Sequence, residues 1–249
     1  MRILGISSMF HDAAVTVIQD GQIEFAGHAE RYSKEKNDAF INPELMAEAL
    51  RNGLPDVIVL HEKTWAKRAR SLYAGNWSTF QEPTQEQWIR EFYPELAEVP
   101  IKSYWHHETH AAAGVLTSDF QECAVMVIDA IGEFDTATIW HWIGGKLKKL
   151  HSIKFPHSLG LFYSAMTDFV GLKPMEDEYI LMGMAAYGKP IYANELNKRL
   201  FKTSKGIKGK KNLQRGLPQE FLGRDLMTGT DEWGHTSMDY NLAASAQAV

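Results

Sequence analysis

Short apolar runs rich in β-branched residues alternate with polar turns in the first part of the chain. Residues 2–8 (RILGISS) and 13–19 (AAVTVIQ) have the pattern of buried strands. A DG pair at 20–21 is a typical hairpin turn, and QIEFAGHAE over 22–30 follows it as a third strand. The chain therefore opens with a predicted three-stranded meander.

The same order of elements returns in the second half. Residues 122–129 predict a buried strand, 136–143 a second and 146–155 a third, with a Gly-Gly turn at 144–145. The two meanders differ in sequence, so the repeat is one of architecture. Two such meanders, each followed by helices, predict an α/β protein with two similar RNase H-like subdomains, the layout of the actin-like ATPases. Two unrelated α/β layers are the alternative.

The remaining periodicities fill in this layout. We expect a helix over 43–52, strands over 56–61 and 101–105, helices with loops over 64–98, and a helix over 158–172. The subdomain boundary is placed after residue 121. This gives a first subdomain over 1–121 and the start of a second, apparently truncated, over 122–249.

The last third of the chain carries three further signals. Gly183 and Gly188 predict a packed turn or a close backbone approach. Residues 202–217 hold six basic and no acidic side chains, which is typical of a solvated loop, with an anion site as the alternative. Asn241 is the expected cap of a final helix, and no stop signal follows it, so we expect a longer natural protein.

Composition narrows the class of protein. The 249 residues carry a net charge of -5, which argues against a surface that coats nucleic acid. The single cysteine excludes an intramolecular disulfide, and no run approaches the roughly 20 apolar residues of a membrane span. His11 and Asp12 interrupt the apolar N-terminus too early for a secretory signal. These features predict a cytoplasmic protein without a membrane partner.

WHHETHAAAG (105–114) is the strongest candidate for chemistry. His106 and His110 are four residues apart, so on a helix both rings project from one face and can share a metal, while His107 points elsewhere. Asp129 ends an apolar strand and is a candidate third ligand, because a carboxylate there is costly unless paired or bound to a cation. The alternatives are a surface or core histidine pair and an aspartate that caps a turn.

Two loops carry the remaining candidates. His11 and Asp12 lie between the first two strands, where a histidine can serve as a general base. Glu133, Asp135 and Thr136 occupy the matching loop of the second half. They are placed to meet a nucleotide ribose or phosphate, or they shape the turn.

Six segments, in order and over nearly the whole chain, resemble the O-carbamoyltransferases of nodulation-factor and antibiotic biosynthesis. They are ILGISSMFHDAAVTVIQDGQIEFAGHAERYSKEKND, HHETHAAAG, VMVIDAIGEFDTATI, SLGLFYSAMTDFVGL, YILMGMAAYG and NLAASAQAV. The resemblance implies an N-terminal domain with the actin-like double fold, similar to the transferase that makes threonylcarbamoyladenosine in tRNA. It also implies transfer of a carbamoyl group from carbamoyl-adenylate to the hydroxyl of a small-molecule acceptor.

The resemblance further implies a metal ion, most often iron, with zinc or manganese as alternatives. His106 and His110 match the family's HxxxH ligands, and Asp129 matches its aspartate ligand. His11 matches a histidine of the transfer step, and we expect Asp12 to orient it.

In the second loop, the resemblance implies that Gly132, Glu133 and Thr136 lie near the adenylate phosphate. Two positions depart from the family pattern. Ile180 stands where a lysine is usual, and Asn37 where a histidine is frequent. Without that lysine, a basic contact to the anionic carbamoyl-adenylate is missing or comes from another residue.

The family's fourth metal ligand, its glycine-rich nucleotide motif and its adenylate-forming domain correspond to positions beyond Val249. The full reaction, which starts from carbamoyl phosphate and ATP, would then need the C-terminal region or a partner chain. A homodimer is compatible with this. The competing hypotheses are a non-catalytic actin-like module that binds a nucleotide or a partner, and an actin-like kinase, against which the histidines argue.

Overall fold

A computed structural model describes residues 1–202, 208–209 and 235–249 of the chain. The chain forms two compact units, Met1–Ala113 and Gly114–Val249, and each is described by itself below. The expected subdomain boundary after residue 121 stays a prediction. The α/β class is confirmed, because both units combine a β-sheet with helices.

The first unit is built on a five-stranded sheet in the order β3-β2-β1-β4-β5. The strands are β1 (Arg2–Ser7), β2 (Ala14–Gln19), β3 (Gln22–His28), β4 (Val57–Leu60) and β5 (Ile101–Ser103). β1 pairs antiparallel with β2 and parallel with β4, so the expected meander continues into a parallel half. In the β2–β3 turn, Asp20 and Gly21 have φ of 49° and 84°, the left-handed conformation that such a tight hairpin requires.

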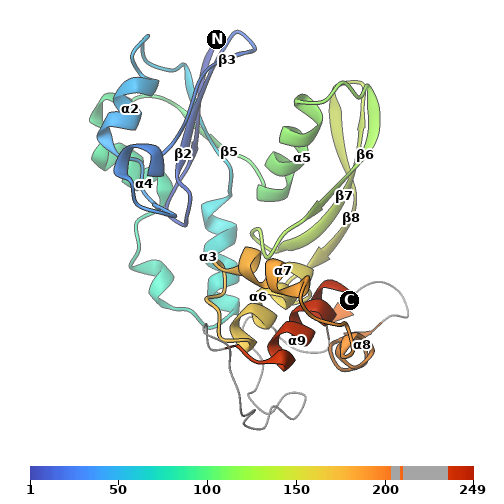
Figure 1. Ribbon diagram of the computed structural model, residues 1–249. Helices are drawn as coiled ribbons and strands as arrows, with labels where there is room; N and C mark the ends of the chain where they lie inside the picture. Colours follow the sequence, from blue (N-terminus) through green and yellow to red (C-terminus); the bar gives the residue numbers. More distant parts are fainter. Residues whose placement is uncertain (203–207, 210–234) are drawn as a thin grey trace. The chain divides into compact units, whose positions relative to one another are not determined.

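Helices lie between and after these strands, and some of them complete the core of the sheet. They are α1 (Glu30–Ser33), α2 (Pro43–Ala49), α3 (Thr64–Tyr73), η1 (Ser78–Phe80), α4 (Gln85–Phe92), η2 (Pro94–Leu96) and α5 (His106–Leu116). The core joins Leu4 and Ile58 of the strands to Leu45 of α2 and Ile89 of α4, all fully buried. Figure 1 shows α2 and α4 beside the sheet. Helix α5 ends this unit and runs into the next.

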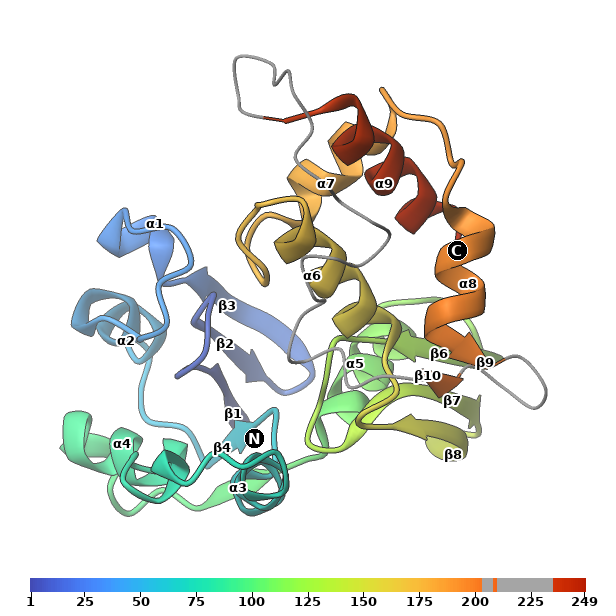
Figure 2. The same cartoon turned by 90° about the horizontal axis from the view of Figure 1, so that it is seen from below.

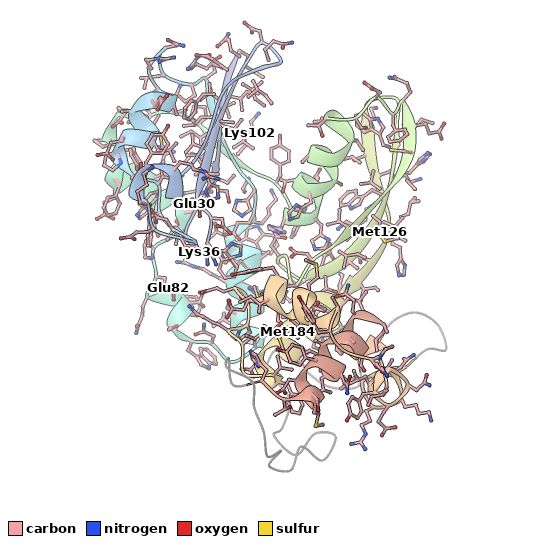
Figure 3. All side chains as sticks on the ribbon, in the orientation of Figure 1. Glu30, Lys36, Glu82, Lys102, Met126 and Met184 are labelled. Carbon is pink, nitrogen blue, oxygen red and sulfur yellow. The ribbon has the colours of Figure 1, made fainter. Side chains whose placement is uncertain are left out.

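The second unit begins with a three-stranded antiparallel sheet in the order β6-β7-β8. Its strands are β6 (Glu122–Ile128), β7 (Asp135–Ile143) and β8 (Lys146–Lys154). Gly144 and Gly145 form the β7–β8 turn with φ of 57° and 74°. Both units therefore start with the same meander, which confirms the repeat of architecture that the strand pattern predicts. Met126 projects from β6 and is 66% exposed (Figure 3).

Helices follow the second meander. They are α6 (Leu159–Phe169), α7 (Glu178–Ala185), α8 (Ala193–Leu200) and α9 (Ser237–Gln247), with a small sheet of β9 (Phe201–Lys202) and β10 (Lys208–Gly209). Helices α6, α7 and α9 pack side by side (Figures 1 and 2). Among the described helices, none is both long and apolar enough to span a membrane.

The two glycines of residues 179–190 behave differently. A Cβ on Gly188 would overlap the backbone carbonyl of Tyr240 in α9, so a close backbone approach is confirmed there. Gly183 lies inside α7, and a Cβ there would meet no atom of the described residues within 4 Å beyond the adjacent helix backbone. The expectation of a tight approach is wrong for Gly183.

The last helix begins earlier than expected. Thr236, and not Asn241, is the N-cap of α9: its hydroxyl accepts from the Asp239 N–H, and the Asp239 carboxylate accepts from the Thr236 N–H. Asn241 instead accepts a hydrogen bond from the Lys189 N–H at 2.8 Å, which ties α9 to the segment after α7. The basic segment 202–217 lies outside the described residues except for 202 and 208–209.

Candidate functional site

Helix α5 brings two of the predicted ligands together within the first unit. His106 is its first residue, and His110 follows one turn later on the same face. Their Nε2 atoms lie 3.0 Å apart, and the ring centroids are separated by 4.6 Å at an interplanar angle of 81°. His107 is buried, 1% exposed, and is not part of this pair, as the helical spacing predicts.

The spacing of the His106 and His110 nitrogens suits a shared metal. Two imidazole nitrogens bound to one tetrahedral zinc, each at about 2.1 Å, are about 3.4 Å apart. The observed separation of 3.0 Å needs only a small change of side-chain torsion to reach that value. His110 is exposed and His106 half-buried, so an ion could reach the pair.

His61 is a neighbour of the pair that the sequence reasoning missed. It directly follows β4, and its ring centroid lies 5.4 Å from that of His106. Burial lowers the pKa of His61, Glu62 acts in the opposite direction, and His106 lowers it further. The neutral ring is therefore favoured beside the pair. The signal in the sequence was its position at the end of the predicted strand over 56–61, because α/β proteins often place functional groups at strand ends.

The loop between β1 and β2 holds His11 and Asp12 in contact. His11 Nδ1 lies 2.7 Å from Asp12 Oδ2, and both side chains are 44% exposed. Because a carboxylate only accepts, a hydrogen bond here requires a proton on Nδ1, which leaves the lone pair of a neutral ring on Nε2. Asp12 has a φ of 55°, and the next residue, Ala13, donates its N–H to the Asp38 carbonyl at 2.8 Å. The fold thus holds an oriented histidine at this loop.

In the second unit, Asp129 directly follows β6. One carboxylate oxygen, Oδ1, accepts the Ala130 N–H at 2.7 Å, so Asp129 does shape the following turn. The hydroxyl of Ser158 donates to the carbonyl of Ala130 at 2.6 Å and lies 3.3 Å from that of Asp129. Gly160 of α6 packs on the same backbone, and a Cβ there would lie 2.5 Å from Ala130 Cα. The backbone of Asp129 is therefore fixed by α6.

Gly132 and Glu133 lie in the loop between β6 and β7, Thr136 is the second residue of β7, and all three are buried. The Thr136 hydroxyl lies within hydrogen-bond reach of two backbone carbonyls, those of Ile153, at 3.1 Å, and His157. A hydroxyl has a single proton to donate, so in this conformation Thr136 serves the β7–β8 structure. A contact of these residues with a nucleotide stays a prediction.

The predicted residues thus divide between the units. The first unit holds His11, Asp12, His106 and His110, and the second holds Asp129, Gly132, Glu133 and Thr136. Within the first unit, the structure brings His11 to Asp12 and His106 to His110.

Comparison with known proteins places these residues in a family context. Residues 66–215 match the sequence profile of the carbamoyltransferase N-terminus. The Synechocystis protein sll1178 is 35% identical, with 77% of this chain and 35% of that protein covered. Nodulation protein NolO of Bradyrhizobium diazoefficiens is 37% identical over 91 residues, 36% of this chain and 16% of its own. The chain spans about a third of the length of the first relative and less of the second.

Solved structures resemble the chain more distantly. A Ppx/GppA protein of Aquifex aeolicus covers 80% of this chain at 12% identity, with a TM-score of 0.30. A TM-score of this size is too low to establish a shared fold. The matched sequence range, by contrast, contains His106, His110, Asp129 and the loop after it.

Proposed function

Because the chain belongs to the carbamoyltransferase N-terminus family, we propose that it carries the acyl-transfer site of a carbamoyltransferase. The observation that carries this proposal is the histidine pair in the matched range. Nε2 of His106 and Nε2 of His110 converge to 3.0 Å on one face of α5, close to the spacing of about 3.4 Å for two imidazole nitrogens on one metal. The proposed donor is carbamoyl-adenylate, and the proposed acceptor is the hydroxyl of a small molecule.

Carbamoyl-adenylate is a mixed anhydride, so its carbonyl carbon is already activated. The residues of the site must therefore position the acceptor and remove its proton. In the proposed step, His11 Nε2 takes the hydroxyl proton while the hydroxyl oxygen bonds to the carbamoyl carbon. The bond from that carbon to the phosphate oxygen breaks, and AMP leaves with the electron pair. Asp12 accepts from His11 Nδ1 and stabilises the imidazolium that forms.

We propose that His106, His110 and Asp129 hold a divalent metal, iron first, with zinc or manganese as alternatives. Two imidazoles and a carboxylate are a ligand set that these borderline ions accept. When bound, the ion would act as a Lewis acid on the carbamoyl carbonyl or hold the phosphate.

The adenylate needs a phosphate site, which we assign to the loop of Gly132, Glu133 and Thr136. For Thr136 to take part, its hydroxyl would have to give up its hydrogen bond to a backbone carbonyl and donate to a phosphate oxygen instead. Formation of carbamoyl-adenylate from carbamoyl phosphate and ATP is assigned to the rest of a longer protein or to a partner chain, because this chain covers 35% of the relative sll1178. A homodimer is compatible both with a longer protein and with a separate partner chain.

The test of the transfer step supplies synthetic carbamoyl-adenylate, the metal and a panel of hydroxyl compounds that includes sugars and nucleosides. AMP release and the carbamate product are followed by mass spectrometry. We expect acceptor-dependent AMP release that His11→Gln slows at least a hundredfold, which is about the contribution of a general base. The matched control is His151→Gln, at an exposed position on β8. Equal rates in both variants contradict the role of His11.

A second candidate function is a non-catalytic actin-like module that binds a nucleotide or a partner. One observation favours its partner-binding form: Glu133 and Thr136 are 3% and 1% exposed, and the Thr136 hydroxyl serves the backbone. A module of this kind predicts association with a second chain and no transfer from supplied carbamoyl-adenylate. Carbamate formation by the isolated chain would contradict it.

A further inference from the structure

His28 lies beside the His11–Asp12 pair, although neither its sequence context nor the family resemblance assigns it a role. It is the last residue of β3, and the β2–β3 register places it opposite Ala14, two residues after Asp12. Its Nε2 lies 3.8 Å from Asp12 Oδ1. The other oxygen of the same carboxylate, Oδ2, contacts His11 Nδ1 at 2.7 Å. One carboxylate thus lies between two imidazole rings.

A second carboxylate lies on the far side of His28. Its Nδ1 is 3.8 Å from Oε1 of Glu30, the first residue of α1, which is labelled in Figure 3. Within the part of the chain that the structure describes, this buried Nδ1 has no hydrogen-bond partner. Glu30 also lies 4.0 Å from the guanidinium of Arg31. Separations of 3.8 Å exceed a direct hydrogen bond but suit an ion pair or a bridging water.

We propose that His28 is a positioning residue for His11 and acts through the Asp12 carboxylate. Rotation of the Asp12 side chain about χ1 would otherwise withdraw the carboxylate from His11. A ring N–H of His28 next to Oδ1 favours the one rotamer in which Oδ2 faces His11. Glu30 lies on the Nδ1 side of the ring, where a bridging water, or an ion pair with the protonated ring, would hold His28 in this orientation. The kinetic consequence rests on the proposed function, whereas the orientation of His11 does not.

The first experiment measures this orientation in the full chain without any substrate. The ¹⁵N chemical shifts of the His11 ring report whether the proton is on Nδ1 or Nε2. We expect the Nδ1–H form to dominate in the wild type and a mixture of both forms in His28→Gln. The matched control is His141→Gln, which removes a half-buried histidine from its 2.7 Å contact with Glu122 in the other unit. A His11 tautomer that is the same in His28→Gln and wild type overturns the proposal.

A second variant guards against misfolding of His28→Gln. Glu30→Gln keeps the size of the side chain and removes the charge behind His28, so it should shift the His11 tautomer in the same direction. If His28→Gln does not fold and Glu30→Gln leaves the tautomer unchanged, the proposal is also overturned.

The second experiment is a double-mutant cycle on carbamoyl transfer. His28→Gln should lower kcat about tenfold, the usual size for a residue that orients a functional group, with an unchanged KM for carbamoyl-adenylate. Since His28 acts through Asp12, adding His28→Gln to Asp12→Asn should have no further effect. Full additivity contradicts the proposed path. A shifted tautomer in a chain that shows no transfer at all refutes the proposed function and leaves the positioning role standing.

Discussion

The contact of Gly160 with the Asp129–Ala130 backbone gives a sharp prediction about the second unit. A methyl group at Gly160 would lie 2.5 Å from Ala130 Cα and 2.8 Å from the Asp129 carbonyl carbon. Carbon atoms in contact normally lie about 3.5–4.0 Å apart, so Gly160→Ala forces a displacement of about 1 Å. Neither partner is a flexible side chain, because both are backbone. We expect a loss of about 1–2 kcal/mol in the free energy of unfolding, the usual size for overpacking.

Gly183→Ala is the matched control, because it makes the same chemical change in the neighbouring helix α7. Among the described residues, no atom outside the neighbouring backbone of α7 lies within 4 Å of the added methyl group there. The replacement of glycine by alanine inside a helix should stabilise the unit by up to about 1 kcal/mol. The free energy of unfolding should therefore fall in Gly160→Ala and rise in Gly183→Ala, and the two variants should differ from each other by about 2 kcal/mol.

Native-state hydrogen exchange, followed in peptides from α6 and α7, measures the stability of the second unit independently of the first. A difference of about 2 kcal/mol corresponds to roughly a thirtyfold difference in the exchange rate of globally protected amides. Gly160→Ala should exchange faster than wild type, and Gly183→Ala more slowly. Equal protection in the two variants would refute the claim that α6 is fixed against the strand end that carries Asp129.

Two further predictions concern titratable groups of the first unit. Burial raises the pKa of Tyr93 from 10 to about 12, so the stability that depends on its neutral hydroxyl is complete below pH 10 and is lost as the pH rises to 12. Tyr93→Phe removes the 2.7 Å hydrogen bond to the Ile41 carbonyl and should cost about 1 kcal/mol of unfolding free energy at neutral pH. In urea titrations at several pH values, the variant should no longer show this alkaline loss of stability. Arg2 holds the pKa of Glu24 below its ordinary 4.5, so the stability from this pair is present above pH 4.5 and lost as the pH falls below it. Glu24→Gln should flatten the acid limb of the stability profile, and an unchanged limb would contradict the pairing with Arg2.

The strands were predictable because their signal is local. Alternation of apolar and polar residues over 2–8, 13–19 and 136–143 is set by which face of the sheet is buried, and the DG and GG turns fix the hairpins. His106 and His110 were predictable for the same reason, since helical geometry alone places residues four apart on one face. The family resemblance added the roles of these residues.

The final helix shows where local signals compete. Thr236 and Asn241 are both good caps, and the apolar small residues begin only after Asn241. The capping box between Thr236 and Asp239 starts the helix earlier, and Asn241 is then used for the contact with Lys189. That contact joins segments 52 residues apart, so the local pattern carries no sign of it.

The neighbourhood of His28 was hidden for a geometric reason. Counted from the DG turn without irregularity, Ala13 would be opposite His28. A β-bulge between Val17 and Ile18 shifts the register, and Ala14 takes that place. A shift by one residue changes which side chains share a face, so the approach of His28 to Asp12 depends on a bulge that sequence patterns do not mark.

Metal binding by α5 and Asp129 tests the central claim most directly. The purified chain would be incubated with Fe²⁺ under anaerobic conditions, or with Zn²⁺, and its metal content measured after removal of unbound ions. We predict an equimolar amount of metal in the wild type and in His151→Gln, and little in His106→Gln, His110→Gln or Asp129→Asn, with all variants folded by circular dichroism. A folded wild type that takes up no metal, or ligand variants that retain the wild-type amount, would contradict the account.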